Sequence, residues 1–368
     1  MKRKLIFTAA LLCVMLFVPL ALYSQEFQMD GPTLVKYNGN AANVTIPEGV
    51  TAIGYWAFAN NSSFTSITIP ESVTSIGDGA FSRCTSLASV TIPSSVTFIG
   101  LGAFAECTNL INVTIHTGVT SIDLGVFSGC TSLTSITIPS SVTSIDLGAF
   151  TGCTSLASII IPTSVTSIGY EAFAGCTSLT SITIPSSVTS IGYEVFAGCS
   201  RLASITIPSS VTFIGNRAFD DTAWFNSQPD GLVYAGKILY VYKGTMPANT
   251  VINNIRADTT GIGIGVFSRR SSLVSVTIPS SVTSIGEGAF FECSSLTSVT
   301  IPSSVTSIGE SAFAYCSSLT NVTIPTSVTL IENWAFSECS NLRTVTVSKK
   351  TTIGENAFPD TARITYSD

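Results

Sequence analysis

The residues of this chain that could do covalent chemistry or bind a metal are one histidine and ten cysteines. A Ser-His-Asp or Cys-His catalytic site would have to use His116, since the chain has no other histidine. His116 occupies a strand-ending position that elsewhere holds proline, as at Pro93 and Pro139, so we expect it at a corner of the backbone. The sequence therefore predicts no catalytic residue and no enzymatic activity.

Nine of the cysteines recur at one spacing, which decides between disulfides, a metal site and a structural role. They lie 23 residues apart in two series: Cys84, Cys107, Cys130, Cys153, Cys176 and Cys199, then Cys293, Cys316 and Cys339. Thiols at equivalent positions have parallel Cα–Cβ bonds, whereas a disulfide needs Cβ atoms that converge. A column of single thiols also lacks the tetrahedral geometry of a zinc site. We predict buried structural thiols, with no disulfide, no metal and no cofactor.

Charge excludes a further class of function. Only 10% of the residues are charged and the net charge is −6, so the chain has no basic surface for the phosphates of a nucleic acid. Acidic residues precede the recurring phenylalanines, at Asp78, Glu171, Glu194, Glu287, Glu310 and Glu355. Stacked carboxylates could bind calcium, but many repeats lack the acid. We favour a solvated edge that keeps the protein soluble.

The apolar residues recur with the same 23-residue period as the cysteines. Phenylalanine recurs thirteen times, for example at Phe150, Phe173 and Phe196, and residues 176–198 show the unit cleanly. Within it, Leu179, Ile182 and Ile184 alternate with Ser and Thr, which predicts a short half-buried strand ended by proline. The stretch that ends at Cys199 predicts a single helical turn. One unit cannot bury its apolar side alone, but stacked copies share a continuous core, in which Phe173, Phe196, Cys176 and Cys199 form structural ladders.

The repeat L-x-x-I-x-I-P-x-x-V-x-x-I-G-x-x-A-F-x-x-C resembles the bacterial leucine-rich repeats of the BspA-like, or Treponema pallidum-type, family. The resemblance covers about residues 44–358. It implies a mostly β repeat solenoid: an arc of about thirteen 23-residue coils with a parallel sheet and short helical turns, interrupted by one β-hairpin insertion. It further implies a surface-exposed or secreted protein that binds other proteins, often as an adhesin.

The N-terminus predicts export. Lys2, Arg3 and Lys4 precede an apolar stretch from Leu5 to about Leu22, and polar residues follow around Ser24, which is the layout of a secretory signal peptide. An uncleaved anchor helix is the alternative; after cleavage no transmembrane anchor would remain. The expected organisation is a signal peptide (1–24), an N-terminal cap (25–43), repeats (44–220), an aromatic hairpin insertion (221–257), repeats (258–358) and a C-terminal cap (359–368).

The insertion is rich in aromatic residues and contains two strand-like runs, Leu232 to Tyr234 and Ile238 to Tyr242, which are joined by Ala-Gly-Lys and predict a β-hairpin. Its aromatic residues include Trp224, Phe225, Tyr234, Tyr240 and Tyr242. They either pack the hairpin onto the solenoid or form a projecting recognition element, because exposed Tyr and Trp are favoured binding anchors. The sequence leaves both interpretations open.

The outward positions of the strands form columns of Ser and Thr, which include Thr137, Thr183, Thr206, Ser181 and Ser204. One interpretation is that threonine is simply favourable in strands. The other is an uncharged face that binds an extended protein or a glycan through many weak contacts; a protein ligand is favoured, with extracellular-matrix proteins as the class to test. Two alternatives for the whole chain stay open: a flat hydroxyl array that orders water at an ice surface, and a structural spacer that binds nothing.

Overall fold

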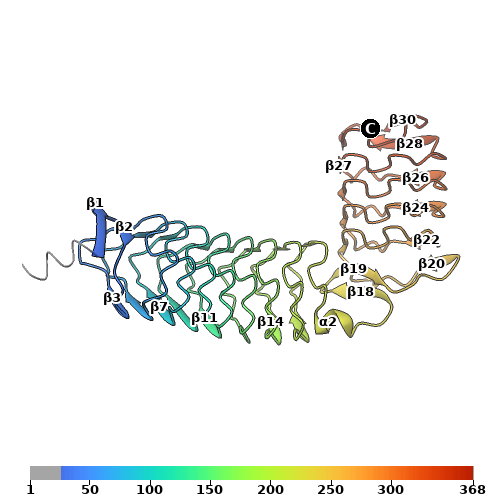
Figure 1. The fold of residues 1–368 in the computed structure, drawn as a ribbon. Helices are drawn as coiled ribbons and strands as arrows, with labels where there is room; N and C mark the ends of the chain where they lie inside the picture. Colours follow the sequence, from blue (N-terminus) through green and yellow to red (C-terminus); the bar gives the residue numbers. More distant parts are fainter. Residues whose placement is uncertain (1–25, 368) are drawn as a thin grey trace, which may run out of the picture. The chain divides into compact units, whose positions relative to one another are not determined.

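The computed structural model describes residues 26–367, so the predicted signal peptide lies outside the described residues. The chain is a β-solenoid in which coils of about 23 residues stack and equivalent strands pair (Figure 1). It divides into two compact units, residues 1–183 with 196–204 and residues 184–195 with 205–368. Each unit is described by itself below.

The first sheet of unit 1 contains one strand from each of five successive coils. Its strands pair in parallel, with Thr91 opposite Thr114 and Thr137 opposite Thr114 on the other side. The apolar residue at the centre of each strand faces the core and its neighbours face solvent, as the alternating sequence requires. The strands are β3 (Asn43–Thr45), β5 (Ser66–Thr68), β7 (Ser89–Ile92), β9 (Asn112–Ile115) and β11 (Ser135–Thr137). Strand β14 (Ser181–Thr183) also belongs to this unit.

A second, narrower ladder runs along another side of the coil and is built mainly from two-residue Ser-Ile strands. They fall in two sheets, the first with β4 (Ala52–Ile53), β6 (Ser75–Ile76) and β8 (Phe98–Ile99), the second with β10 (Ser121–Ile122), β12 (Ser144–Ile145) and β13 (Ser167–Ile168). Glycine follows most of them because neighbouring backbones approach closely. A Cβ atom at Gly77 would lie 2.9 Å from the carbonyl carbon of Gly54. At the N-terminal end, β1 (Phe27–Asp30) pairs antiparallel with β2 (Thr33–Tyr37), and β2 pairs in parallel with β4.

The third side of each coil does not form the expected helical turn. It is a run of tight turns in which left-handed residues recur, such as Gly148 (φ 61°) and Gly152 (φ 73°). In these turns every second N–H points toward the next coil: the amides of Gly148, Phe150 and Gly152 each donate to a carbonyl of the following coil at 2.8 Å. A helical turn would direct these amides along its own axis and lose the ladder between coils.

Unit 2 repeats this plan around a hairpin. Strands β18 (Gly231–Ala235) and β19 (Ile238–Lys243) pair antiparallel, which confirms the predicted β-hairpin. They begin a seven-stranded sheet that continues through β21 (Gly261–Ile262), β23 (Ser284–Ile285), β25 (Ser307–Ile308), β27 (Leu330–Ile331) and β29 (Thr352–Ile353). The six-stranded sheet contains β20 (Thr250–Ile252), β22 (Leu273–Thr277), β24 (Ser298–Thr300), β26 (Asn321–Thr323), β28 (Thr344–Ser348) and β30 (Arg363–Ser367).

Ahead of the hairpin lie β15 (Ser190–Ile191), which pairs with β17 (Phe213–Ile214), and the helix α2 (Ala223–Asn226). Strand β16 (Ser204–Thr206) falls where the two units divide.

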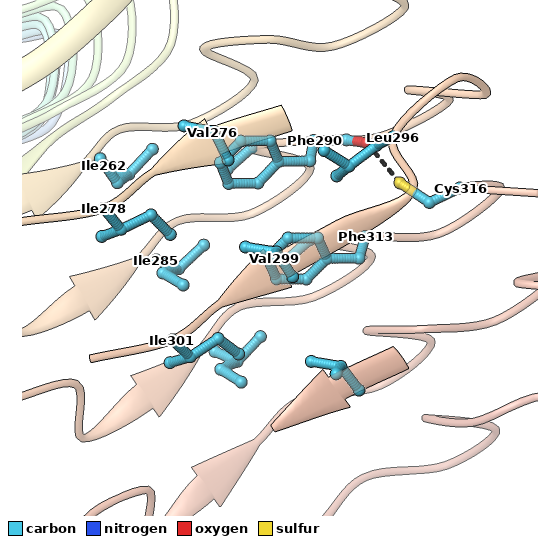
Figure 2. Close-up of a cluster of buried hydrophobic side chains, with 14 of the residues drawn as sticks. Ile262, Val276, Ile278, Ile285, Phe290, Leu296, Val299, Ile301, Phe313 and Cys316 are labelled. Carbon is cyan, nitrogen blue, oxygen red and sulfur yellow. Dashed lines mark hydrogen bonds between the residues drawn. The ribbon is translucent and has the colours of Figure 1, made fainter. Parts of the chain in front are cut away.

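A column of stacked phenylalanine rings occupies the centre of each unit. Phe173 and Phe196 are fully buried, with ring centroids 5.6 Å apart and planes 4° from parallel. In unit 2, the rings of Phe290 and Phe313 lie 4.8 Å apart among Val276, Val299 and their neighbours (Figure 2). Leu, Ile and Val of successive coils pack in the same way, so the apolar core is continuous from coil to coil.

The nine cysteines of residues 26–367 are free and buried, in agreement with the predicted structural thiols. Each donates a hydrogen bond to the phenylalanine carbonyl of the preceding coil, as Cys316 Sγ does to Phe290 O at 3.1 Å (Figure 2). Cys176 and Cys199 bond Phe150 O and Phe173 O at 3.3 and 3.1 Å. Each of these carbonyls also accepts a backbone N–H of its own coil, as Phe290 O does from the Cys293 amide at 3.1 Å, so the thiol of the next coil supplies a second donor.

Burial makes the stability of the fold sensitive to alkaline pH. Desolvation raises the pKa of Cys153 to about 12, whereas a free cysteine has a pKa of about 8.5. The folded state therefore keeps the proton, so the contribution of the thiol is complete below about pH 8.5 and is lost as pH rises toward about 12. We expect the free energy of unfolding of the parent chain to fall more steeply between these limits than that of Cys153→Ala, by up to about 1.4 kcal/mol per pH unit.

Urea denaturation followed by circular dichroism at a series of pH values measures this difference. The other titrating groups are common to the two proteins, and only Cys130 and Cys176, whose pKa Cys153 helps to raise, are also affected by the substitution. Parallel pH profiles for the parent and Cys153→Ala would contradict the buried neutral thiol.

Candidate binding surfaces

The first candidate surface is the hydroxyl face, which we define as the outward Ser, Thr and Asn side chains of β3, β5, β7, β9, β11 and β14. Ser181, Thr183 and Thr137 lie on it and are exposed. Side chains of adjacent strands meet there: Ser66 Oγ donates to Asn43 Oδ1 at 2.6 Å, and Ser135 Oγ donates to Asn112 Oδ1 at 3.0 Å. The face thus offers hydroxyl and amide groups in register and at coil spacing. Ser204 and Thr206 lie in β16, and both are exposed.

One apolar residue interrupts the threonine column. Ile160 stands where neighbouring coils have threonine, and 84% of its surface is exposed. Residues 158–161 form no strand, although Ile159 and Ile161 keep their buried positions. The hydroxyl face is therefore regular over β3 to β11 and changes character at Ile160.

A separate column of threonines serves the scaffold and not a ligand. The hydroxyls of Thr74, Thr143 and Thr166 each donate to the backbone carbonyl of the equivalent residue one coil earlier, at 3.1 to 3.3 Å. Thr306 and Thr329 do the same in unit 2 at 3.2 Å. Threonine frequency alone therefore does not mark a binding surface, because this column is explained by bonds between coils.

The aromatic residues of the insertion pack mainly against each other. Tyr240 is buried, its hydroxyl accepts a hydrogen bond from the amide of Phe219 at 3.3 Å, and burial raises its pKa. The ring of Phe219 lies edge-on to Trp224 and Tyr240, at 5.0 and 5.2 Å. Phe225 is half-buried and lies edge-on to Tyr240 at 6.2 Å. Together these rings form the apolar packing beside Phe219, where the column of stacked phenylalanines is interrupted.

Two arginines and a lysine fix the remainder of the insertion. The Arg270 guanidinium lies 5.4 Å from the centre of the buried Tyr242 ring, and that of Arg256 lies 4.8 Å from the centre of Tyr234. The ammonium group of Lys243 donates to the carbonyl oxygens of Phe225, Asn226 and Gln228, at 3.1, 3.0 and 2.6 Å. Its positive charge thereby lies at the C-terminal end of helix α2, where the carbonyl dipoles favour a cation.

These contacts favour the packing interpretation for Tyr240 and Tyr242, whose side chains are 6% and 8% exposed. The hairpin strands also extend the seven-stranded sheet. Trp224, Phe225 and Tyr234 are half-buried, so part of each ring is accessible to solvent.

Within residues 26–367, no group of three or more His, Cys, Asp or Glu side chains is arranged to hold a metal ion. His116 is exposed, and its amide donates to Ile92 O at 3.1 Å. The same described part of the chain has no helix long and apolar enough to span a membrane. Among the acids before the phenylalanines, Asp78 accepts from the Leu101 amide at 2.9 Å and Glu194 pairs with Arg217 at 2.9 Å.

One exposed surface is not apparent from the sequence alone. Leu101, Leu124, Leu147 and Tyr170 stand at the same position of four successive coils and expose 47%, 44%, 43% and 39% of their surface. We call these four residues the apolar stripe. Their 23-residue spacing is visible in the sequence, but a turn position gave no reason to distinguish an exposed from a buried side chain.

The sequence matches the model of a known protein family. The model of the BspA type leucine rich repeat region matches residues 35–150, 120–227 and 249–367, in six copies. The chain belongs to the BspA-type leucine-rich repeat family. Proteins of this family are in general binding scaffolds without enzymatic activity. A comparison with curated proteins finds no match.

Solved structures of related proteins resemble this BspA-type protein over most of its length. A leucine rich cell surface protein from Faecalibacterium prausnitzii is 35% identical, with 93% of each chain covered and a TM-score of 0.47. A leucine-rich repeat protein from Bacteroides ovatus is 29% identical, over 91% of this chain and 87% of the other, with a TM-score of 0.47. The leucine rich repeat protein of T. pallidum is 20% identical, over 87% of this chain and 89% of the other, with a TM-score of 0.27.

Proposed function

We propose that this protein is an exported, adhesin-like binding scaffold that recognises another protein through the hydroxyl face. The observation that carries the proposal is the run of exposed, uncharged Ser, Thr and Asn side chains held in register by the parallel strands β3 to β11. A rigid array of hydrogen-bonding groups costs little entropy when it binds, because the scaffold has already ordered it. Family membership favours a protein ligand over an ice surface.

Export rests on the N-terminal pattern of Lys2, Arg3 and Lys4, the apolar stretch and the polar residues around Ser24. The Faecalibacterium relative is described as a cell surface protein, which supports the same location for this chain. Catalysis plays no part in the proposal.

Export predicts a processed N-terminus. When the full chain is expressed with its native N-terminus, we expect the protein recovered outside the cytoplasm to begin near residue 25. Mass spectrometry of the intact protein measures this directly. Recovery of a chain that still begins at Met1, or of protein retained in the cytoplasm, would contradict the export proposal.

Recognition through the hydroxyl face predicts loss of binding when the face is charged. Thr114→Lys with Thr137→Lys places two ammonium groups on adjacent strands of the face, and we expect the affinity for a bound extracellular-matrix protein to fall at least about tenfold. Biolayer interferometry against an immobilised panel of such proteins measures the effect.

The matched control is Ser140→Lys with Thr163→Lys, which adds the same charge at exposed coil corners outside the strands. It should change the affinity by less than about twofold. Equal losses in the two double variants, or no binding to any panel protein by a chain whose folding is verified by circular dichroism, would contradict recognition through this face.

A further inference from the structure

The apolar stripe is a continuous surface of unit 1. The carbonyls of Leu124, Leu147 and Tyr170 accept hydrogen bonds from Gly102, Gly125 and Gly148 of the preceding coils, at 2.9, 3.0 and 2.8 Å. Since these bonds fix consecutive coils at the stripe itself, the four side chains stand in one row at about the 4.8 Å spacing of paired strands. The row therefore extends over about 14 Å.

The scaffold does not require apolar residues in this row. In unit 2 the equivalent positions hold Glu287, Glu310 and Asn333, and the same carbonyl bonds form at 2.9, 2.8 and 3.0 Å. Coils therefore stack equally well with polar side chains there. In a chain with few charged residues, a row of exposed leucines lowers solubility without stabilising the stack, and a contiguous exposed apolar surface of this kind marks an interaction site.

Carboxylates border the stripe, and two of them occupy positions where packing favours glycine. Asp123 and Asp146 directly precede Leu124 and Leu147, at the position held by Gly169 one coil later. A Cβ atom at Gly169 would lie 2.8 Å from backbone atoms of Asp146 and Leu147. Accommodating an aspartate here thus has a cost in packing, and stacking gives no reason for it.

The two aspartates follow paired strands, since Ile122 lies opposite Ile145 and the Asp146 amide donates to Ile122 O at 2.8 Å. Partial burial and the neighbouring Asp123 raise the pKa of Asp146. Two carboxylates of like charge are therefore held side by side. On the other border, Glu171 follows Tyr170 directly. A cation placed along the stripe would relieve the repulsion between the aspartates.

We propose that the apolar stripe docks a basic amphipathic segment of a partner protein, with its apolar side chains on Leu101, Leu124, Leu147 and Tyr170 and its Lys or Arg residues beside the bordering carboxylates. A helix meets the spacing: residues at i, i+3 or i+4 and i+7 recur on one face and span about 10 Å. A second copy of this chain would bring carboxylates against carboxylates, and an anionic membrane would be repelled. This surface lies on a different side of the coil from the hydroxyl face, so the proposal goes beyond the proposed function.

A synthetic helical peptide of leucine and lysine, with leucines on one face, is the probe, and titration calorimetry with the full chain measures its binding. Leu124→Ser with Leu147→Ser should weaken binding at least about tenfold. Asp123→Asn with Asp146→Asn should weaken it by several-fold and reduce its dependence on salt. Leu330→Ser, at an exposed leucine of unit 2, and Glu48→Gln with Glu71→Gln, at exposed acids elsewhere, are the matched controls and should change it by less than about twofold.

Four results would overturn the proposal: no binding to the parent chain, equal losses in stripe and control variants, equally tight binding of a peptide with glutamate in place of lysine, or a dimer in sedimentation that Leu124→Ser with Leu147→Ser dissociates. The last result would assign the stripe to a second copy of the chain. Circular dichroism melting curves establish that each variant remains folded. None of these measurements involves the hydroxyl face, so failure here leaves the proposed function to its own test.

Discussion

The structure depends on the contact between one coil and the next. A coil of about 23 residues is too small to bury its own apolar side, so its leucines, isoleucines and phenylalanines become buried only when another coil covers them. Three ladders hold this contact in register: the parallel strands, the two-residue strands, and the amides of the tight turns that donate to the following coil. The cysteine thiols add a fourth set of bonds within the core.

Much of this architecture follows from spacing alone. Alternation around Leu179, Ile182 and Ile184 predicts the strands, the fixed position of the thiols predicts that they stay free, and turn chemistry predicts the hairpin. The tight turns could not be predicted in the same way. The left-handed conformation that recurs at Gly148 and Gly152 accompanies hydrogen bonds to the next coil, which local propensity does not contain.

The candidate surfaces could also be predicted only in part from the sequence. Thr137, Thr183 and Ser181 could be placed on the strand surface, because side chains alternate in a strand. The roles of Tyr240 and Tyr242 could not be decided, because the sequence shows the same aromatic residue whether its ring covers a core or faces solvent. The apolar stripe was invisible for a related reason: exposure at a turn depends on the positions of neighbouring coils.

Each coil therefore contains two sets of residues under different constraints. Inward residues are fixed by stacking, while outward residues vary without disturbing it, as the leucines of unit 1 and the glutamates of unit 2 at one equivalent position show. This freedom allows one scaffold to present an uncharged hydroxyl face on one side and an acid-bordered apolar stripe on another. Both surfaces are held in place by the backbone ladders and the core beneath them, and on the hydroxyl face Ser66 and Ser135 also donate to side chains of the preceding strand.

The free energy of unfolding of two single variants tests this separation most directly. The ring of Phe150 stacks between those of Phe127 and Phe173, at 5.6 and 5.3 Å, whereas Thr137 is exposed on the hydroxyl face. In urea denaturation, we expect Phe150→Ala to lower the free energy of unfolding by about 3–5 kcal/mol and Thr137→Ala to change it by less than about 0.5 kcal/mol. Comparable losses for the two variants would contradict the claim that stacking alone stabilises the solenoid and leaves its surfaces free for recognition.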